Sequence, residues 1–496
     1  MTTPSPPRSS PGVLPSVDAI QVARSSLLKT LPGEGLGAEH IEAHLRNDIV
    51  PGLNRPSESS HYYGFVIGGV APAARTADYL VTETDQNVGV HLPKETIATE
   101  VEDRALHMVC ELLDLHPRDW PHRTFTTGAT ASNVLGLAVG REHIIQKVAA
   151  HSSSVGRAIS VADIGLHKAM KWAGISDVHI LTTVAHSSLR KAASIVGLGR
   201  SAVIDVGRPD QPHRFDLSYL RDLLSTADTA SIVVVSCAEI NTGFFATDGA
   251  DMVKIRALCD QYGAWLHVDA AFGLLARALP QTKDYASLNA GVAGLQLADS
   301  ITGDAHKLLN VPYDCGIFLS RYLATGVNVF QNTNAAYLKP ASSETTTSTA
   351  RDIPSPLNIG IENSRRFRAL PVYASLTAYG RIWYRDMLER QIRLARCIAE
   401  SILESNEFVL LPNDIKMTRA ERLGRVYIIV LFRAKDDSLN DALVQRINGS
   451  RKIYVSGTQW DGKPAARFAI ATWKVDVERD LPVIKEELTN AVRRAV

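Results

Sequence analysis

Residues 264–273 read Ala-Trp-Leu-His-Val-Asp-Ala-Ala-Phe-Gly, an apolar run that ends in a carboxylate between small residues. The run is short and lacks polar alternation, which is typical of a strand buried on both faces. Similar runs occur at 158–162, 178–181, 201–205 and 231–236, and helix-length segments separate most of them. Strands that alternate with helices indicate a mostly parallel sheet, so the sequence predicts an α/β domain.

The length of 496 residues allows two or three structural units. We expect a disordered tail and N-terminal helical segment over residues 1–60, and the large domain over residues 61–330. Residues 331–370 form a polar loop and connection, which we expect to be mobile, and residues 371–496 form a small C-terminal α+β domain. Three apolar runs in this last part are expected to be strands: 408–411, 425–432 and 468–472.

The composition excludes several classes of partner. Lys and Arg number 53 and Asp and Glu 52, so no net charge attracts the chain to nucleic acid or to an anionic membrane. The most apolar stretch, 232–238, is far shorter than the roughly 20 residues that span a bilayer. Five dispersed cysteines without a CxxC pair indicate buried thiols in a reducing compartment and no zinc site, so we expect a cytoplasmic protein.

Four patterns fall where expected strands end. Residues 125–133 combine small and hydroxyl side chains before a helical run, which suits either a phosphate or a plain helix cap. Asp269 follows a strand, Lys307 lies between an expected polar turn at 300–304 and an apolar segment, and His186 follows the run at 178–181. Each has an ordinary structural alternative. Together they provide what a pyridoxal phosphate site needs: a phosphate turn, an aromatic ring, an acid and an imine-forming lysine.

The sequence resembles the pyridoxal-phosphate-dependent group II amino-acid decarboxylases, the family of aromatic-L-amino-acid and glutamate decarboxylases. The resemblance extends from about His61 to the C-terminus. Its motifs are His61–Phe65, Asp85–Pro93, His186–Ser188, His267–Ala271, Asp304–Lys307, Val311–Gly316 and Arg365–Leu370. It implies the aspartate-aminotransferase-like fold-type I architecture, with a mostly parallel seven-stranded sheet and a small C-terminal domain. It also implies a homodimer with active sites at the subunit interface.

The resemblance implies a role for each matching residue. Lys307 corresponds to the lysine that forms a Schiff base with pyridoxal 5'-phosphate, Asp269 to the partner of the pyridine nitrogen, and His186 to the imidazole stacked on the ring. The remaining cofactor-binding residues are Ala271 against the other face of the ring, Gly128, Ala129 and Thr130 in the phosphate turn, and Asp304 and His306 before the lysine. The implied reaction removes the α-carboxylate of an amino acid as CO2 and returns a proton to the α-carbon.

Two departures from the family pattern bear on the reaction. Glu239 stands where the family usually has a threonine, and we hypothesise that it shapes substrate choice or acts as an acid and also contacts the cofactor; the alternative is a salt-bridged structural role. The loop tyrosine of aromatic-amino-acid decarboxylases corresponds to about Pro356, and no tyrosine occurs between Leu338 and Val372. His186 or a tyrosine of a partner subunit are alternative proton donors.

The leading hypothesis is therefore a homodimeric decarboxylase of a small amino-acid substrate. An aldehyde-forming oxidative deaminase on the same scaffold is second. A non-catalytic dimer that binds the cofactor or another protein is third, and the retention of Lys307, Asp269 and His186 argues against it. A nicotinamide-dependent enzyme would need a GxGxxG motif between a strand and a helix, which the sequence lacks. The substrate itself is left open.

Overall fold

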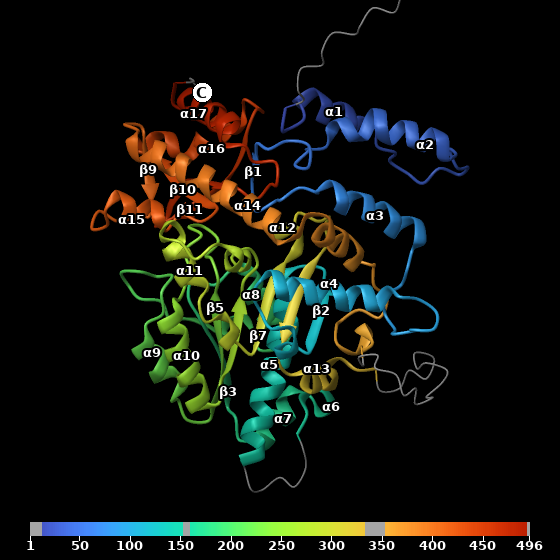
Figure 1. Ribbon diagram of the computed structural model, residues 1–496, viewed down its shortest axis with the longest axis vertical. Helices are drawn as coiled ribbons and strands as arrows, with labels where there is room; N and C mark the ends of the chain where they lie inside the picture. The colour runs from blue at the N-terminus through green and yellow to red at the C-terminus, as the bar shows by residue number, and fades with distance from the viewer. Residues whose placement is uncertain (1–11, 152–158, 333–352, 494–496) are drawn as a thin grey trace, which may run out of the picture. The chain divides into compact units, whose positions relative to one another are not determined.

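The computed structural model describes residues 12–151, 159–332 and 353–493 (Figure 1). The chain divides into two compact units, one of residues 70–389 and one of residues 1–69 together with 390–496. Half of the segment expected as a polar loop and connection at 331–370, residues 333–352, lies outside the described residues.

A seven-stranded sheet forms the centre of the unit of residues 70–389. Its strands, in spatial order, are β2 (His122–Thr126), β8 (Gly316–Ser320), β7 (Ser300–Asp304), β6 (Trp265–Asp269), β5 (Thr229–Ser236), β3 (Asp177–Thr182) and β4 (Val203–Asp205). β8 is antiparallel to both neighbours, and the pairs from β7 to β4 are all parallel. This confirms the predicted mostly parallel sheet. The register places Ser236 beside Asp269 and Asp269 beside Thr302, so the carboxyl ends of β5, β6 and β7 are adjacent.

Helices connect and cover these strands (Figure 1). They are α3 (Pro72–Thr84), α4 (Ala98–Leu112), α5 (Ala129–His151), α6 (Val161–Ile164), α7 (Leu166–Ala173), α8 (Ser187–Ile195), α9 (Leu217–Leu224), α10 (Gly249–Tyr262), α11 (Ala286–Val292), α12 (Ala305–Leu308) and α13 (Leu323–Phe330). The longest of them, α5, packs across β5, β6, β7 and β8. Glycines allow this close approach: a Cβ atom on Gly136 would lie 2.5 Å from Cε1 of His267, and one on Gly140 would lie 2.8 Å from Cδ1 of Trp265.

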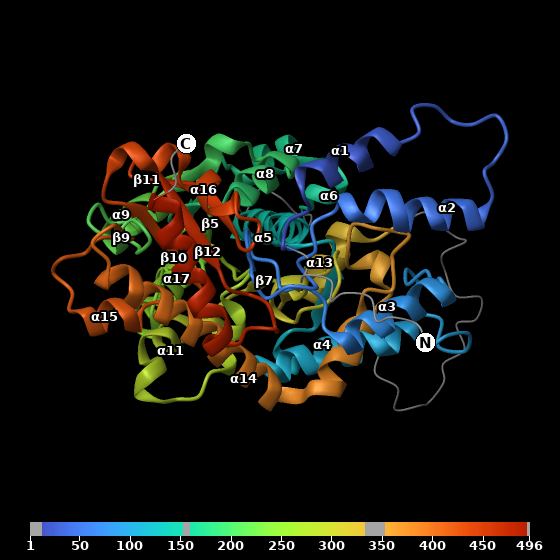
Figure 2. The same cartoon turned by 90° about the horizontal axis from the view of Figure 1, so that it is seen from above.

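The other unit contains a five-stranded sheet with the order β1 (Tyr62–Tyr63), β11 (Tyr454–Trp460), β12 (Lys463–Ala469), β10 (Ile429–Ala434) and β9 (Phe408–Leu411). Its helices are α1 (Val17–Ser26), α2 (Ala38–His44), α15 (Arg419–Gly424), α16 (Asn440–Asn448) and α17 (Val477–Arg493), and α14 (Ala369–Glu404) ends in it. α16 packs on α17, β11 and β12, the strands and helices coloured orange and red in Figure 2. The buried aromatic rings of Tyr63, Phe432 and Phe468 lie in its core.

A buried carboxylate also links distant segments within this unit. Asp480 accepts hydrogen bonds from Ser60 at 2.9 Å, His61 at 3.0 Å and Nε of Arg479 at 2.7 Å. Burial alone would raise the pKa of Asp480, but the hydrogen bonds from His61 and Arg479 outweigh it and hold the pKa well below its ordinary value. The carboxylate therefore stays charged and joins the segment before β1 to the start of α17.

The strands expected from apolar runs are mostly confirmed. The runs at 178–181, 231–236 and 408–411 lie in β3, β5 and β9, and the run at 264–268 lies in β6 except for its first residue. Those at 201–205, 425–432 and 468–472 overlap β4, β10 and β12 only in part. The strand expected at 158–162 is wrong, because its described residues lead into a helix. Ser160 caps α6 by accepting a hydrogen bond from the Asp163 amide at 3.3 Å.

The polar turn expected at 300–304 is also wrong, because these residues form the buried strand β7. Ser300 and Thr302 remain in the interior since each has a hydrogen-bond partner in the ring of His267, at 2.7 Å and 3.3 Å. Hydroxyl groups can line a buried strand when a neighbouring strand satisfies them.

All five cysteines are free thiols, and four of them are buried. Burial raises the pKa of Cys110 and of Cys259 to about 12, which keeps these thiols protonated and unreactive. Within the described ranges, no helix combines the length and the apolar character needed to cross a membrane.

The contact between α5 and β6 predicts the effect of a small substitution. Gly136→Ala should destabilise the protein by about 1–3 kcal/mol, because the added methyl group overlaps the buried His267 ring. Gly424→Ala in α15 is the matched control, since a Cβ there meets nothing within 4 Å and should be neutral or slightly stabilising. Thermal and urea unfolding measure both variants. Equal stability of Gly136→Ala and the wild type would contradict the tight contact.

Candidate active site

A cavity of about 340 Å³ lies in the unit of residues 70–389, where β2, β5, β6 and β7 end. Every predicted site residue except Glu239 lines it: Gly128, Ala129, Thr130, His186, Asp269, Ala271, Asp304, His306 and Lys307. Residues as far apart in the chain as Gly128 and Lys307 are therefore collected at one place. This is the edge at which open α/β sheets bind ligands.

The turn between β2 and α5 provides one wall of the cavity. Gly128 has a φ of +153°, a value that L side chains rarely adopt, and α5 begins at the next residue. A Cβ on Gly316 of β8 would lie 2.4 Å from Oγ1 of Thr126 and 2.6 Å from Cα of Gly128, so only glycine fits at that position. The first amide groups of a 23-residue helix thus border the cavity. Such amides and the helix dipole favour an anion such as a phosphate.

Lys307 and Asp304 form an ion pair in this cavity. Nζ of Lys307 lies 2.7 Å from Oδ2 of Asp304, and Oδ1 of Asp304 accepts a hydrogen bond from the Ala129 amide at 2.6 Å. The side chain of Asp304 is only 3% exposed. One buried carboxylate therefore orients both the lysine and the first residue of α5.

His306, directly before the lysine, is held by the start of β8. Its Nδ1 lies 2.9 Å from the carbonyl oxygen of Cys315, and its ring stacks near Tyr313 with centroids 4.3 Å apart. Burial lowers the pKa of His306, although the nearby Asp304 opposes this effect. The neutral imidazole is therefore favoured, and it forms part of the wall of the cavity.

Asp269 is the last residue of β6 and reaches the cavity half-buried. Its Oδ2 accepts a hydrogen bond from Nδ2 of Asn133 at 2.8 Å, and its Oδ1 accepts a weaker one from the Ala271 amide at 3.3 Å. A carboxylate fixed in this way can accept a further hydrogen bond from a protonated ring nitrogen in the cavity.

His186 precedes α8 and acts as its N-cap. Its Nδ1 lies 2.6 Å from Oγ of Ser188 and accepts a hydrogen bond from the Ser188 amide at 3.2 Å. The residue as a whole is exposed, and it borders the same cavity as Lys307 and Asp269. These bonds fix the direction of an imidazole at the border of the cavity.

Glu239 does not line the cavity and is 2% exposed. Its Oε1 accepts a hydrogen bond from the Asn241 amide at 2.9 Å, and its Oε2 accepts from the amide and from Oγ1 of Thr242, both at 2.8 Å. The Glu239 carboxylate thus accepts hydrogen bonds from residues of its own turn. This geometry favours a structural role over contact with the cofactor or substrate, although the structural partners are amides and a hydroxyl instead of a cation.

Several further residues line the cavity and were not among those predicted: Thr127, Ala131, Val184, Ser188, Ser236, Ala238, Ile240, Phe272 and Tyr313. Asn133 does not line it but contacts Asp269 from behind. A sequence signal for Asn133 existed, because it lies one helical turn after Ala129 and thus on the same face of α5.

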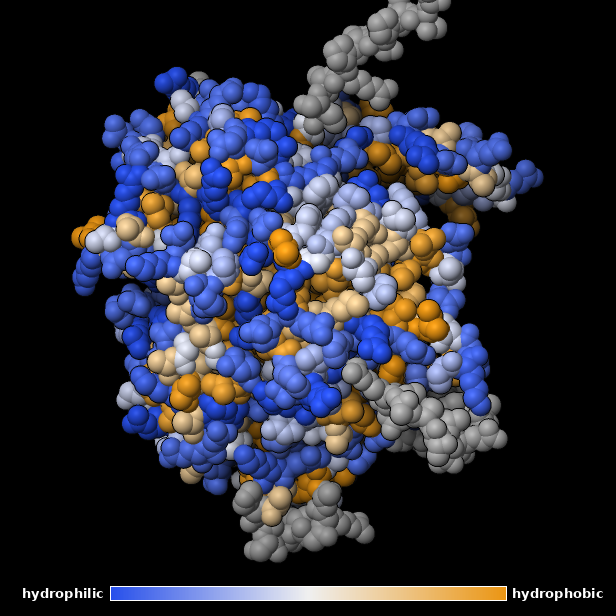
Figure 3. Space-filling model, viewed as in Figure 1, coloured by the Kyte–Doolittle hydropathy of each residue, from blue (hydrophilic) through white to orange (hydrophobic). Residues whose placement is uncertain are grey.

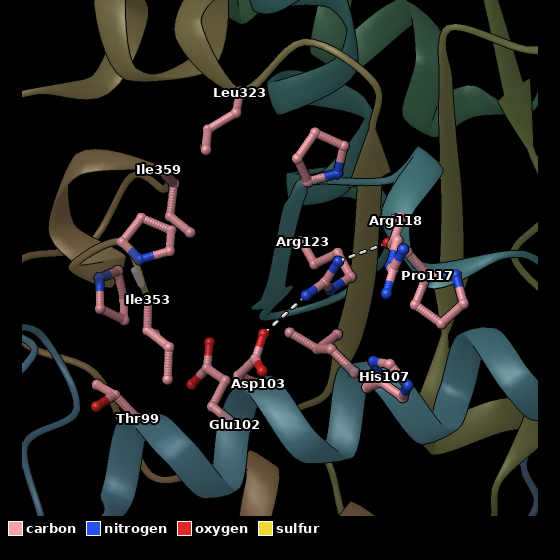
Figure 4. A pocket seen from close by; sticks show the side chains of 14 residues that line it. Thr99, Glu102, Asp103, His107, Pro117, Arg118, Arg123, Leu323, Ile353 and Ile359 are labelled. Carbon is pink, nitrogen blue, oxygen red and sulfur yellow. Dashed lines mark hydrogen bonds and ion pairs between the residues drawn. The ribbon is translucent and has the colours of Figure 1, made fainter. Parts of the chain in front are cut away.

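A second cavity, of about 320 Å³, lies beside α4 and β2 (Figure 4). Asp103 of α4 and Arg123 of β2, which both line it, form an ion pair with Nη2 of Arg123 2.7 Å from Oδ1 of Asp103, as the dashed line shows. Pro356, the position matched to the family's loop tyrosine, lines this cavity and not the one with Lys307. No predicted cofactor-binding residue lies here, so the candidate chemistry belongs to the first cavity.

A mostly parallel seven-stranded sheet with a lysine, a paired carboxylate and a helix N-terminus at its carboxyl edge defines a fold-type I pyridoxal-phosphate enzyme. The chain belongs to the pyridoxal-dependent decarboxylases, since residues 24–420 match the family described as "Pyridoxal-dependent decarboxylase conserved domain". The family assignment and the cofactor implied by the sequence are thereby confirmed.

Individual relatives agree with this assignment. The chain is 24% identical over 434 residues to tryptophan decarboxylase 1 of Oryza sativa subsp. japonica, which covers 86% of this chain and 79% of that protein. It is 28% identical over 277 residues to 3,4-dihydroxyphenylacetaldehyde synthase of Drosophila melanogaster, covering 55% and 49%. The crystal structure of Oryza sativa TDC with PLP and tryptamine superposes with a TM-score of 0.76 at 19% identity, covering 97% and 93%. This last likeness confirms the fold.

The hydrogen bonds of Glu239 lead to a prediction that separates its two hypothesised roles. Glu239→Thr should destabilise the protein by about 1–3 kcal/mol, because it leaves buried amides of the turn without an acceptor. The ranking of substrates should stay unchanged. Glu421→Thr is the control, because Glu421 accepts similar bonds from Thr418 at an exposed site where water can replace it. A changed substrate ranking with unchanged unfolding would restore the role in substrate choice.

Proposed function

We propose that the protein decarboxylates an L-amino acid to the corresponding amine and CO2, with Lys307 as the lysine that binds pyridoxal phosphate. The convergence of Lys307, Asp269, His186 and the first turn of α5 on one cavity carries this proposal. The residues present fit the cofactor. The helix N-terminus suits its phosphate, the acceptor-only carboxylate of Asp269 suits its ring nitrogen, and Lys307 suits its aldehyde.

Each residue has a defined task in the proposed mechanism. The amides of Thr130 and Ala131, residues that line the cavity, would bind the phosphate, while the Ala129 amide donates to Asp304. The oxygens of Asp269 would hold a proton on the ring nitrogen. When bound, pyridoxal phosphate supplies an electron-accepting ring that lowers the cost of losing CO2 from the substrate. His186 would restrain the ring by stacking. Asp304 accepts a hydrogen bond from Nζ of Lys307, 2.7 Å from its Oδ2, and thereby orients the lysine side chain.

The aldehyde-forming reaction is the second candidate function. It is supported by the lack of a tyrosine between residues 338 and 372 and by the similarity to an aldehyde synthase. Proline at position 356 has no proton to donate, so a different group must protonate the substrate carbon if the amine is the product. His186 lines the same cavity as Lys307 and is the candidate within this chain.

Product analysis with a panel of aromatic, acidic and basic amino acids tests these functions. We expect amine and CO2 in equal amounts without oxygen uptake. Lys307→Ala should lower the rate by more than about 10²-fold and abolish borohydride trapping of the cofactor. Lys283→Ala, at an exposed lysine away from the cavity, is the control and should retain both. Aldehyde, ammonia and peroxide with oxygen uptake would instead establish the second function.

We also propose that two chains associate as a homodimer. The N-terminal segment from α1 to α2 carries many exposed apolar side chains, and Figure 3 shows them interleaved with hydrophilic ones. They are Val17, Val22, Leu27, Leu28, Leu31 and Leu36, with 42–94% of each residue exposed. A monomer seldom leaves so much apolar surface in water, which supports burial against a second copy.

Sedimentation and light scattering test the dimer. The wild type should have twice the 53.9 kDa mass of one chain, and Leu28→Asp combined with Leu31→Asp should shift it toward the monomer. Ile415→Asp is the control, because Ile415 is 85% exposed but lies outside this segment. A wild-type mass of 53.9 kDa at micromolar concentration would contradict the proposal.

A further inference from the structure

Asn133 occupies the centre of a buried hydrogen-bond network behind the cavity. It lies on α5 and has no exposed surface. Nδ2 of Asn133 lies 2.8 Å from Oδ2 of Asp269 and 3.4 Å from Oγ of Ser188, and its Oδ1 lies 2.9 Å from Nε2 of His267. The Asn133 amide thus contacts Asp269 at the end of β6, His267 in the middle of β6 and Ser188 in the first turn of α8.

The chemistry of the partners fixes the direction of these hydrogen bonds. An ionised Asp269 can only accept, so the Asn133 amide must present its NH2 group to it. Oδ1 of Asn133 then faces His267 and requires a donor there, which places the His267 proton on Nε2. The Nδ1 atom of His267 must in turn accept from the hydroxyl group of Ser300 at 2.7 Å.

The other end of this chain of hydrogen bonds is compatible with this direction. Nε1 of Trp265 donates to Oγ of Ser300 at 3.0 Å, and an indole can only donate. Oγ of Ser300 therefore accepts from Trp265, which leaves its own proton for His267. Burial lowers the pKa of His267 to about 4, so its ring is neutral, with a single proton, at neutral pH. The direction of the network is thus set by Asp269, and the donor Trp265 at the other end is compatible with it.

A second branch connects Asn133 to His186. The remaining proton of the Asn133 amide points to Oγ of Ser188, and Oγ of Ser188 lies 2.6 Å from Nδ1 of His186. The Ser188 amide also donates to this Nδ1, so the imidazole accepts there. Asn133 consequently contacts Asp269 directly and His186 through one serine.

We propose that Asn133 is a positioning residue of the active site, which holds the Asp269 carboxylate toward the cofactor ring nitrogen and, through Ser188, orients the His186 imidazole. The hydrogen bond from His267 to Oδ1 of Asn133 prevents a rotation of the amide that would exchange its oxygen and nitrogen. This inference rests on the proposed function, because it assigns Asp269 and His186 to the two sides of a bound pyridoxal phosphate. A buried asparagine with a purely structural role would support stability but leave cofactor binding unchanged.

Titration of the full-length apoprotein with pyridoxal phosphate, followed by absorbance and fluorescence, tests the proposal. Asn133→Asp keeps the shape and the acceptor for His267 but replaces the donor to Asp269 by a second carboxylate. We expect the Kd for pyridoxal phosphate to rise at least tenfold and the absorption band of the bound cofactor to change.

Asn440→Asp is the matched control. Asn440 is a buried asparagine of α16. Its side-chain amide accepts a hydrogen bond from the backbone N–H of Ala434 and donates one to the backbone carbonyl of the same residue. This variant should lose thermal stability to a similar degree while it binds pyridoxal phosphate within twofold of the wild type. A Kd within twofold of the wild type and an unchanged spectrum for Asn133→Asp would overturn the proposal.

A second measurement needs no variant at residue 133. In wild-type protein labelled with 15N-histidine, with His267→Phe used to assign the signal, His267 should be neutral and protonated on Nε2 between pH 6 and pH 8. A proton on Nδ1, or a charged ring in this range, would contradict the orientation of the network. Both tests read cofactor binding or protonation, so a protein that binds pyridoxal phosphate but releases no CO2 would refute the proposed function and not this inference.

Discussion

The contact of the Asp304 carboxylate with the Ala129 amide and the Lys307 ammonium is the interaction on which the site depends. It joins the end of β7, the start of α5 and the short helix α12 through one side chain that water barely reaches. A buried carboxylate is stable only when its oxygens are paired, so these three elements must meet for any of them to be placed correctly. The turn before α5 and the lysine are consequently fixed relative to each other before a ligand binds.

Behind the site, the sheet contains buried polar groups that pair with one another, with Trp265 and with Asn133 of α5. His267, Ser300 and Thr302 lie on adjacent parallel strands with no exposed surface, and α5 covers them. An alternative register of β6 against β7 would leave these groups unpaired in the interior, at a cost of about 1–3 kcal/mol for each. The polar cluster therefore favours one register over the others, in addition to its connection with Asp269 through Asn133.

The sequence alone was sufficient for the features that local patterns encode. Uniformly apolar runs predicted β3, β5, β6 and β9, and the acid and lysine at strand ends predicted the place of Asp269 and Lys307. β7 was missed because Ser300 and Thr302 resemble turn residues, and their burial depends on a histidine more than 30 positions away. The hydrogen-bond partners of the Glu239 carboxylate could not be predicted either, because they depend on which amides of the turn point toward it.

The glycines of α5 link ligand binding to the stability of the core. Because Gly136 and Gly140 rest on the rings of His267 and Trp265, the same helix whose first turn borders the cavity also closes the core over β6. Filling the cavity and keeping this core closed are therefore linked equilibria, and a ligand that binds only the folded state shifts both together. Chains without cofactor would therefore resist unfolding less than chains that have bound it.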